Sequence, residues 1–262
     1  MSATRGPGIA RRADVAAVIG GLATVTAIAW SLTVRLASGM EMPAASMPMA
    51  SSSSMPAPAG GLLLATAMWS AMMVGMMVPS ATPMVVAYTG WTRRGPVAPN
   101  RPTAIASFLA GYVVVWLGFS VAASILQVGL ERLGVLSVMG ATTAPVVGGA
   151  VLVAAGAFQL TRWKEACLGR CRTPVGFLIE QWRDGAWGGL VMGLRHGAYC
   201  LGCCWALMAV LFVVGTMHLA WMAVLAVFVL AEKVAPPVLP IRHVSAAALV
   251  GWGTWMLATA GG

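Results

Sequence analysis

Three cysteines and one histidine occur close together, at spacings that place them on one side of a helix. At 100° per residue, His196, Cys200 and Cys203 fall within an arc of about 60°, and Cys204 lies about 40° beyond Cys200. The surrounding stretch is mostly apolar, so a helix formed here is expected to be buried. Thiolates and imidazoles are good ligands for a soft metal ion. The shared stripe therefore predicts a metal site, whereas a single buried cysteine would indicate only core packing.

A second set of soft donors lies in the apolar run 62–90. Four methionines stand at helical spacings ahead of two prolines: Met72, Met73, Met76 and Met77, then Pro79 and Pro83. Methionine commonly fills gaps in a helix bundle, but its thioether is also a ligand for Cu(I). The prolines free backbone carbonyl groups that a helix in lipid must satisfy elsewhere. We expect a kinked helix whose methionines face the bundle interior and line an entry path for a metal ion.

More methionines occur in the segment 38–61, which is rich in proline, serine and alanine. Met40 and Met42, and then Met47 and Met49, repeat an M-x-M spacing. Without apolar periodicity, this segment is expected to be a mobile extracytoplasmic loop. Thioethers in a solvated loop have no packing role, so the loop is expected to collect Cu(I). The alternative is a tolerant linker in a chain rich in alanine and methionine.

The two remaining cysteines, Cys167 and Cys171, are four residues apart in a basic segment. The positive-inside rule places this segment in the cytoplasm, where a structural disulfide is disfavoured. Two thiolates one helical turn apart could bind a soft ion jointly or pass it to a soluble carrier. They could equally be two unrelated cysteines on a loop, because Gly169 and Pro174 weaken a helix there.

The elements that must position these side chains are membrane helices. Hydrophobic residues make up 59% of the 262 residues and charged residues only 9%, whereas about a quarter of a soluble domain is charged. Apolar runs long enough to cross a bilayer occupy the ranges 14–37, 62–90, 103–130, 144–162, 187–215, 218–236 and 243–259. The predicted fold class is therefore an all-α, polytopic membrane helix bundle of about seven transmembrane helices.

The basic residues predict which side faces the cytoplasm. The net charge is +9, but the arginines and lysines are divided among every second connection, which excludes nucleic acid as a partner and follows the positive-inside rule. The N-terminus is therefore predicted in the cytoplasm, and the protein is expected to be multi-pass in the inner (plasma) membrane. We divide the chain into a cytoplasmic N-terminus with the first transmembrane helix (1–37), the extracytoplasmic loop (38–61), a membrane domain of about five helices (62–236) and a C-terminal helix (237–262).

Two further features of the apolar runs concern packing. Glu232 and Lys233 stand near the predicted inner end of the run 218–236, where an exposed interfacial pair is the default and an inward carboxylate would supply a counter-charge. Small residues also give one face of the run 187–215 room for a close helix contact, within the chain or between two chains. They are Gly188, Gly189, Gly193 and Gly197.

The motifs together resemble a known family. They are Trp69 with the Met72-to-Pro83 pattern, Lys164-x-x-Cys167-x-x-x-Cys171-Arg172-x-Pro174, Gly193-x-x-His196-Gly-x-x-Cys200-x-Gly-Cys203-Cys204-Trp205, and Gly215-x-Met217 to Glu232-Lys233. The chain resembles, over about residues 62 to 236, a family of predicted metal-binding integral membrane proteins, some members of which are labelled copper chaperones. The resemblance implies metal binding by these methionine, cysteine and histidine residues.

These observations predict copper(I) handling, by a transporter or by a membrane-embedded copper chaperone, although another soft metal would suit the same ligands. The loop would collect the ion, the methionines of the run 62–90 would carry it inward, and the cluster from His196 to Cys204 would hold it at mid-membrane. Cys167 and Cys171 would receive it and pass it to a soluble copper carrier or a copper-dependent membrane enzyme.

Two other function classes stay open. Cys200 and Cys203 form a C-x-x-C pair, which is typical of thiol–disulfide exchange. A membrane thiol–disulfide or quinone-linked oxidoreductase is therefore the main alternative. An accessory subunit of a membrane enzyme is the other. We expect the chain not to be an enzyme itself.

Overall fold

The computed structural model describes residues 12–41, 58–92, 101–137, 140–216, 218–236 and 240–260, with the backbone alone for 38–41 and 58–60. Apart from one β-bridge between Leu136 and Thr142, every element in these ranges is a helix, which confirms the all-α class. The helices are α1 (Arg12–Glu41), α2 (Pro58–Thr92), α3 (Arg101–Arg132), α4 (Pro145–Gln159), α5 (Arg162–Arg172), α6 (Pro174–Gln181), α7 (Gly185–Ala209), α8 (Leu211–Val214), α9 (Leu219–Val234) and α10 (Ile241–Ala260).

Four helical stretches are long and apolar enough to cross a membrane. They are Arg12–Ala37, Gly61–Thr92, Arg101–Arg132 and Gly185–Val214, the last formed by α7 and α8. α4 and α5 together pass the same test but meet at an angle of 62°, which makes a fifth crossing if they form one broken span. α4 has 15 residues and α9 has 16, or about 24 Å of helix at most, against a hydrocarbon core of about 30 Å. The four stretches match the first, second, third and fifth predicted runs. A total of seven spans and a cytoplasmic N-terminus remain predictions.

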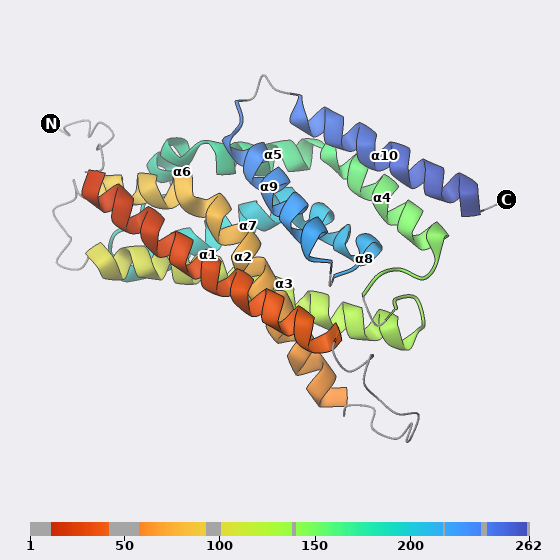
Figure 1. Ribbon diagram of the computed structural model, residues 1–262. Helices are drawn as coiled ribbons and strands as arrows, with labels where there is room; N and C mark the ends of the chain where they lie inside the picture. Colours follow the sequence, from red (N-terminus) through yellow and green to blue (C-terminus); the bar gives the residue numbers. More distant parts are fainter. Residues whose placement is uncertain are drawn as a thin grey trace, which may run out of the picture.

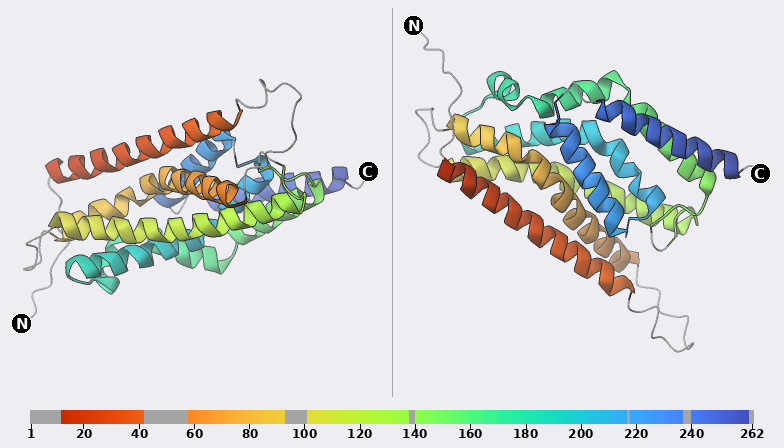
Figure 2. Two further views of the ribbon diagram at one scale, coloured as in Figure 1. Left: turned by 90° about the horizontal axis from the view of Figure 1, so that it is seen from below. Right: turned by 45° about the horizontal axis from the view of Figure 1, so that its top comes forward.

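The centre of the molecule is built from α2, α3, α7 and α9. α3 packs along α7, α2 packs against α1, α3 and α9, and α4 packs along α10. The left view of Figure 2 shows α1 on one side of this centre and α4, α5 and α6 on the other. In Figure 1, α10 lies beside α4 at the edge of the molecule, and α2 bends along its length, as expected for a helix that contains two prolines.

α3 and α7 approach closely because glycines of α7 face α3. A Cβ atom added at Gly189 would lie 2.6 Å from the carbonyl oxygen of Ala104, and one added at Gly193 would overlap the carbonyl oxygen of Phe108. Both contacts are within one chain, so these glycines pack α7 against α3. The sequence had left open whether they make a contact within the chain or between two chains. The close approach brings the aromatic side chains of α3 onto the buried face of α7.

α5 is held against α9 by buried polar contacts. The Thr161 side chain caps α5 by accepting a hydrogen bond from the Lys164 backbone N–H at 3.3 Å. The Lys164 ammonium group lies 3.0 and 2.7 Å from the two carboxylate oxygens of Glu232, and it also donates to the side-chain oxygen of Gln159. At the other end of α5, Arg172 Nε donates to the backbone carbonyl of Glu232 at 2.6 Å. The side chain and the main chain of one α9 residue therefore anchor both ends of α5.

The expectation that Glu232 and Lys233 form an exposed interfacial pair is wrong. Their exposed fractions are 2% and 7%, and that of Lys164 is 0%. An unpaired charge at such a position would be very costly, but Glu232 is compensated by Lys164, 68 residues away in the chain. Sequence spacing cannot reveal a pair of this kind, because its two members meet only after α5 folds back against α9.

The glycine contact predicts a specific sensitivity to added volume. Gly193→Ala should lower the stability of the protein by about 1–3 kcal/mol, because the new methyl group overlaps the backbone of α3. The measurement is the apparent Tm of the purified protein in detergent. The matched control is Gly118→Ala on α3, where an added Cβ meets nothing within 4 Å. That variant should keep or raise the apparent Tm, and equal losses in both variants would refute the proposed close contact.

The buried ion pair predicts a second stability effect. Glu232→Gln leaves the Lys164 charge without its counter-ion at 0% exposure, which should cost about 3 kcal/mol or more. The control is Glu180→Gln, which breaks the ion pair between Glu180 and Arg170. The side chains of Arg170 and Glu180 are 40% and 52% exposed, so this change should cost less than about 1 kcal/mol. Apparent Tm values of the two variants in the same detergent test this. A smaller loss for Glu232→Gln than for Glu180→Gln would contradict the role given to the buried pair.

Candidate metal centre

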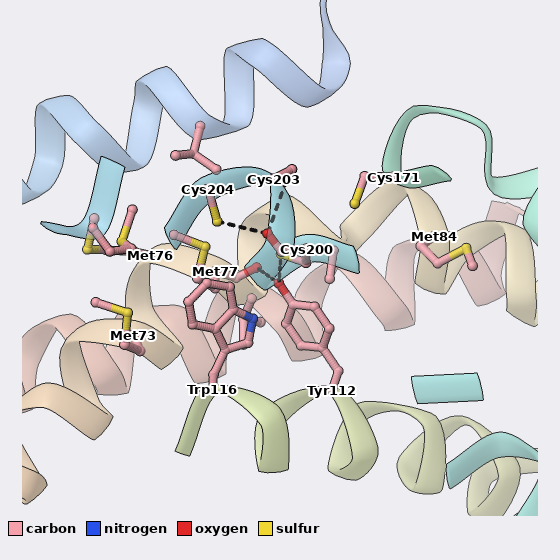
Figure 3. Packing of buried hydrophobic residues seen from close by; sticks show 14 of the residues in the cluster. Met73, Met76, Met77, Met84, Tyr112, Trp116, Cys171, Cys200, Cys203 and Cys204 are labelled. Atoms are coloured by element: carbon pink, nitrogen blue, oxygen red, sulfur yellow. Dashed lines mark hydrogen bonds between the residues drawn. The ribbon is translucent and has the colours of Figure 1, made fainter. Parts of the chain in front are cut away.

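The three cysteines of α7 lie in the centre of the bundle. Their side chains are almost fully enclosed, with exposed fractions of 0% for Cys200 and 1% for Cys203 and Cys204. The thiols of Cys203 and Cys204 each lie 3.0 Å from the backbone carbonyl oxygen of Cys200, and Figure 3 shows these contacts as dashed lines. The Cys204 thiol also lies close to the thiols of Cys200 and Cys203. Helical spacing thus brings three thiols together on the buried side of α7.

A fourth thiol comes from α5. The thiol of Cys171 lies close enough to that of Cys203 for the two side chains to interact. Cys167, one turn earlier on α5, lies against α7 where Gly202 has no side chain, since a Cβ there would be 2.8 Å from the Cys167 sulfur. We call Cys171, Cys200, Cys203 and Cys204 the thiol cluster, with Cys167 at its edge. All five cysteines are free thiols.

The position of Cys171 adds a contact that the sequence did not predict. Cys167 and Cys171 were expected in a basic connection, where they would receive the ion from the cysteines of α7. In the structure, Cys203 meets Cys171 about 27 Å along α7 from its first residue, at 1.5 Å per residue. The reason is the break after α4, since α5 turns there and packs along the middle of α7. The cysteines therefore form one group.

Cys200 has two polar partners from other helices. Its sulfur lies 2.8 Å from the ammonium nitrogen of Lys233 on α9 and 3.1 Å from the hydroxyl of Tyr112 on α3. Lys233 also donates to the hydroxyl of Ser80 on α2 at 2.7 Å, and the Tyr112 hydroxyl donates to the Met77 carbonyl at 2.9 Å. A positive charge beside a sulfur favours its thiolate form, which is the form that binds metals. Residues of α2, α3 and α9 thus converge on one sulfur of α7.

The methionines of α2 belong to the same core as the thiols. Met72, Met73, Met76 and Met77 are all buried in it. In the view of Figure 3, Met73, Met76 and Met77 lie on one side of the α7 thiols, and Cys171 and Met84 lie on the other. The expectation that the four methionines face the bundle interior is therefore met by their burial. An open entry path along them remains a prediction. Two cavities of about 300 and 580 Å³ lie among the described residues, and none of the four methionines lines either of them.

The loop methionines fall largely outside the part that the structure describes. Met42, Met47 and Met49 lie outside the described residues, and Met40 lies in α1 with only its backbone described. Their predicted role in collecting Cu(I) therefore stays a prediction from the sequence.

His196 lies on the same helix but among aromatic rings. Its ring centre is 5.7 Å from that of Tyr112, 6.0 Å from that of Phe108 and 5.6 Å from that of Phe177. Its Nδ1 atom is buried and has no hydrogen-bond partner among the described residues. Tyr112 touches both groups, since it stacks on His196 and bonds to Cys200. The histidine is therefore next to the thiol cluster, with an imidazole nitrogen available to a ligand.

Trp116 adds a second buried polar atom without a partner. Its indole Nε1 has no hydrogen-bond acceptor within the described part of the chain. Figure 3 shows the ring rising from α3 beside Tyr112, toward the thiols and Met77. An indole N–H at this place can donate to a thiolate or to a small ligand.

The residues fit a soft ion by their chemistry, but they do not form a finished coordination shell. Within the described residues, no three side chains of the His, Cys, Asp or Glu types converge closely enough to hold a metal ion. Neighbouring thiols are present, in the order Cys171, Cys203, Cys204 and Cys200, and thioethers surround them. Such an arrangement can offer two thiolates to one ion and adjust through flexible methionine side chains.

Several residues around the cluster are missing from the sequence-based site. Lys233 was noted in the sequence, as an ionisable residue near the end of the run 218–236, but it was expected in an exposed interfacial pair with Glu232. Lys164 stands in one of the motifs that carry the family resemblance, whereas Tyr112 and Ser80 carried no signal. Their roles come from contacts between different helices, such as Lys233 with Ser80 across 153 positions of the sequence.

A comparison with protein families places the chain in a known group. The model of the family PpoB2, described as "Copper chaperone", matches residues 66–256. The match includes the whole thiol cluster and continues past residue 236, where the resemblance seen in the sequence stopped, into α10. Comparisons with curated proteins and with solved structures find no match. Because the match covers more than half of the sequence, the chain belongs to the copper chaperone family PpoB2.

Proposed function

We propose that the protein is a membrane-embedded copper chaperone that holds Cu(I) among the thiols of α5 and α7. The observation that carries the proposal is the thiol cluster, because thiols from two separate helices gather in a core that also contains the methionines of α2. Thiolate and thioether ligands select Cu(I) over harder metal ions. The description of the family names the same metal.

The donors can be ordered by strength. Neutral thioethers bind Cu(I) weakly and reversibly, whereas thiolates bind it strongly, so an ion gains stability as it passes from methionine to cysteine. We propose that the loop 38–61 collects the ion, that Met72, Met73, Met76 and Met77 pass it inward, and that the thiol cluster holds it. Because these methionines are buried, the transfer requires their side chains to move, which three rotatable bonds allow.

Cys167 is the proposed exit. It stands at the edge of the thiol cluster and is only partly buried, whereas Cys171 is buried. A soluble copper carrier or a copper-dependent membrane enzyme could therefore reach Cys167 first. This route serves a chaperone that loads a partner and does not require net transport across the membrane.

The geometry favours metal holding over the redox alternative. Thiol–disulfide exchange requires that the sulfur of a partner reaches an attacking thiolate. Cys200 and Cys203 are enclosed by α2, α3, α5 and α9, with exposed fractions of 0% and 1%. A small soft cation can enter such a core through side-chain motion, but the disulfide of a protein partner cannot.

The proposed setting is the inner (plasma) membrane, with the N-terminus in the cytoplasm. The supporting observations are the four helical stretches that are long and apolar enough to cross a bilayer and the basic residues in every second connection.

Copper retention tests the proposal directly. The full-length protein, loaded anaerobically with Cu(I) and freed of excess metal, should retain copper, and the variant Cys200→Ser with Cys203→Ser should lose it. We expect the affinity to fall by more than tenfold, since removal of residues outside the ligand shell alone costs about 10–100-fold at metal sites. Copper per chain is measured by elemental analysis, and sulfur ligation is measured by X-ray absorption.

A matched control removes a sulfur atom that lies away from the thiol cluster. Met256→Leu on α10 removes a thioether that packs against the small second core, so copper retention should equal that of the wild type. Equal copper contents in the wild type and the double cysteine variant would show that the thiol cluster is not the site. A turning-over Cys200–Cys203 disulfide, trapped in cells, would favour the redox alternative.

A further inference from the structure

The thiol cluster contains a resident positive charge. Lys233 contacts the Cys200 sulfur at 2.8 Å and is anchored on its other side by Ser80 at 2.7 Å. Its nitrogen therefore has one partner that is a candidate metal ligand and one that is a neutral hydroxyl. A lysine in this position contributes its charge to any complex that forms at Cys200.

The other buried charges near the cluster cancel. In the described part of the chain, the buried charged side chains are Lys164, Glu232 and Lys233. Lys164 and Glu232 neutralise each other at 2.7 Å. Arg172 is only partly buried and donates to a backbone carbonyl, so water can solvate its charge. The thiol cluster is thus left with the single positive charge of Lys233.

Charge neutrality then links the charge of the metal to the number of thiolates. A monovalent ion held by two thiolates carries a net charge of minus one, which Lys233 cancels. A divalent ion held by two thiolates is already neutral, and the Lys233 charge is left uncompensated in an apolar interior. Neutrality with a divalent ion requires a third thiolate on the same ion.

The geometry does not supply that third ligand. No three His, Cys, Asp or Glu side chains converge on one point among the residues that the structure describes. Neighbouring thiols follow one another in the order Cys171, Cys203, Cys204 and Cys200. Two neighbours are enough for a soft monovalent ion, because two thiolates can satisfy it. Charge and geometry thus favour the same class of ion.

We propose that Lys233 makes the thiol cluster selective for a soft monovalent cation over a divalent one. This inference rests on the proposed copper function and adds the residue that determines specificity. Lys233 acts by disfavouring the wrong ion as well as by stabilising the right complex, as specific sites generally do. It is a positioning and charge-compensating residue, and no step requires it to leave the cluster.

The test compares the affinities of one protein for two ions. Full-length protein in detergent is titrated with Cu(I) against a Cu(I) chelator and with Zn(II) against a zinc chelator, in the wild type, Lys233→Met and Lys233→Arg. Lys233→Met should lower the ratio of Cu(I) affinity to Zn(II) affinity by about a hundredfold, because the charge that favours the monovalent complex is gone. Lys233→Arg keeps the charge and should retain most of the preference.

The matched control removes the other partner of Lys233 without changing any charge. Ser80→Ala should leave the ratio of affinities within about threefold of the wild type, since a neutral hydrogen bond contributes little net free energy. A ratio that is unchanged in Lys233→Met, or two affinities that fall equally, would overturn the role of Lys233 and leave the copper function standing. A wild-type protein that binds no Cu(I) would overturn the proposed function itself.

The wild type provides a check that does not depend on the folding of a variant. X-ray absorption at the copper edge of the loaded protein should give two sulfur scatterers of thiolate type. Three or more thiolates per copper would contradict the charge balance and overturn the inference, even with copper firmly bound.

Discussion

The ion pair between Lys164 and Glu232 fixes the position of α5, and the arrangement of the thiols depends on it. Two opposite charges at 2.7 Å inside an apolar bundle stay together because separating them would leave both unsolvated. This contact ties the start of α5 to the end of α9, and Arg172 ties the end of α5 to the same residue of α9. Without α5 in this place, Cys171 would not meet Cys203.

The same turn of α9 also delivers Lys233 to the thiols. Glu232 and Lys233 are adjacent in the sequence, so one carboxylate holds α5 while the next side chain reaches across to Cys200. On the opposite side, the glycine contact between α7 and α3 lets Tyr112 touch both Cys200 and His196. A helix that donates the thiols is thus held in place by two helices that supply the polar groups around them.

The sequence predicted the parts of this structure that depend on local pattern. Apolar runs predicted the long helices, and spacing at 100° per residue placed Cys200, Cys203 and Cys204 on one buried side of α7. It did not predict that Cys171 joins them, because a basic segment with a glycine and a proline nearby is typical of a connection outside the membrane. That placement results from the break after α4 and from a salt bridge across 68 positions, neither of which has a local signature.

The polar side chains around the cluster were missed for the same reason. Tyr112 and Ser80 are ordinary residues of apolar helices until Lys233 and Cys200 come within 3.1 Å of them. The methionines are the converse case. Their helical spacing was ambiguous between packing and ligation, and their burial beside the thiols agrees with both roles at once, since a thioether packs and coordinates with the same atom.

The enclosure of the thiols has a chemical consequence for any Cu(I) carried there. Reduced copper in contact with water reacts with hydrogen peroxide and releases radicals, which makes the free ion toxic. The three cysteines of α7, with exposed fractions of 0% to 1%, lie in one core with Tyr112, Trp116 and methionines, and this core would shield the ion from such oxidants before it reaches its recipient. The bundle would then protect the cell from its cargo as well as carry it.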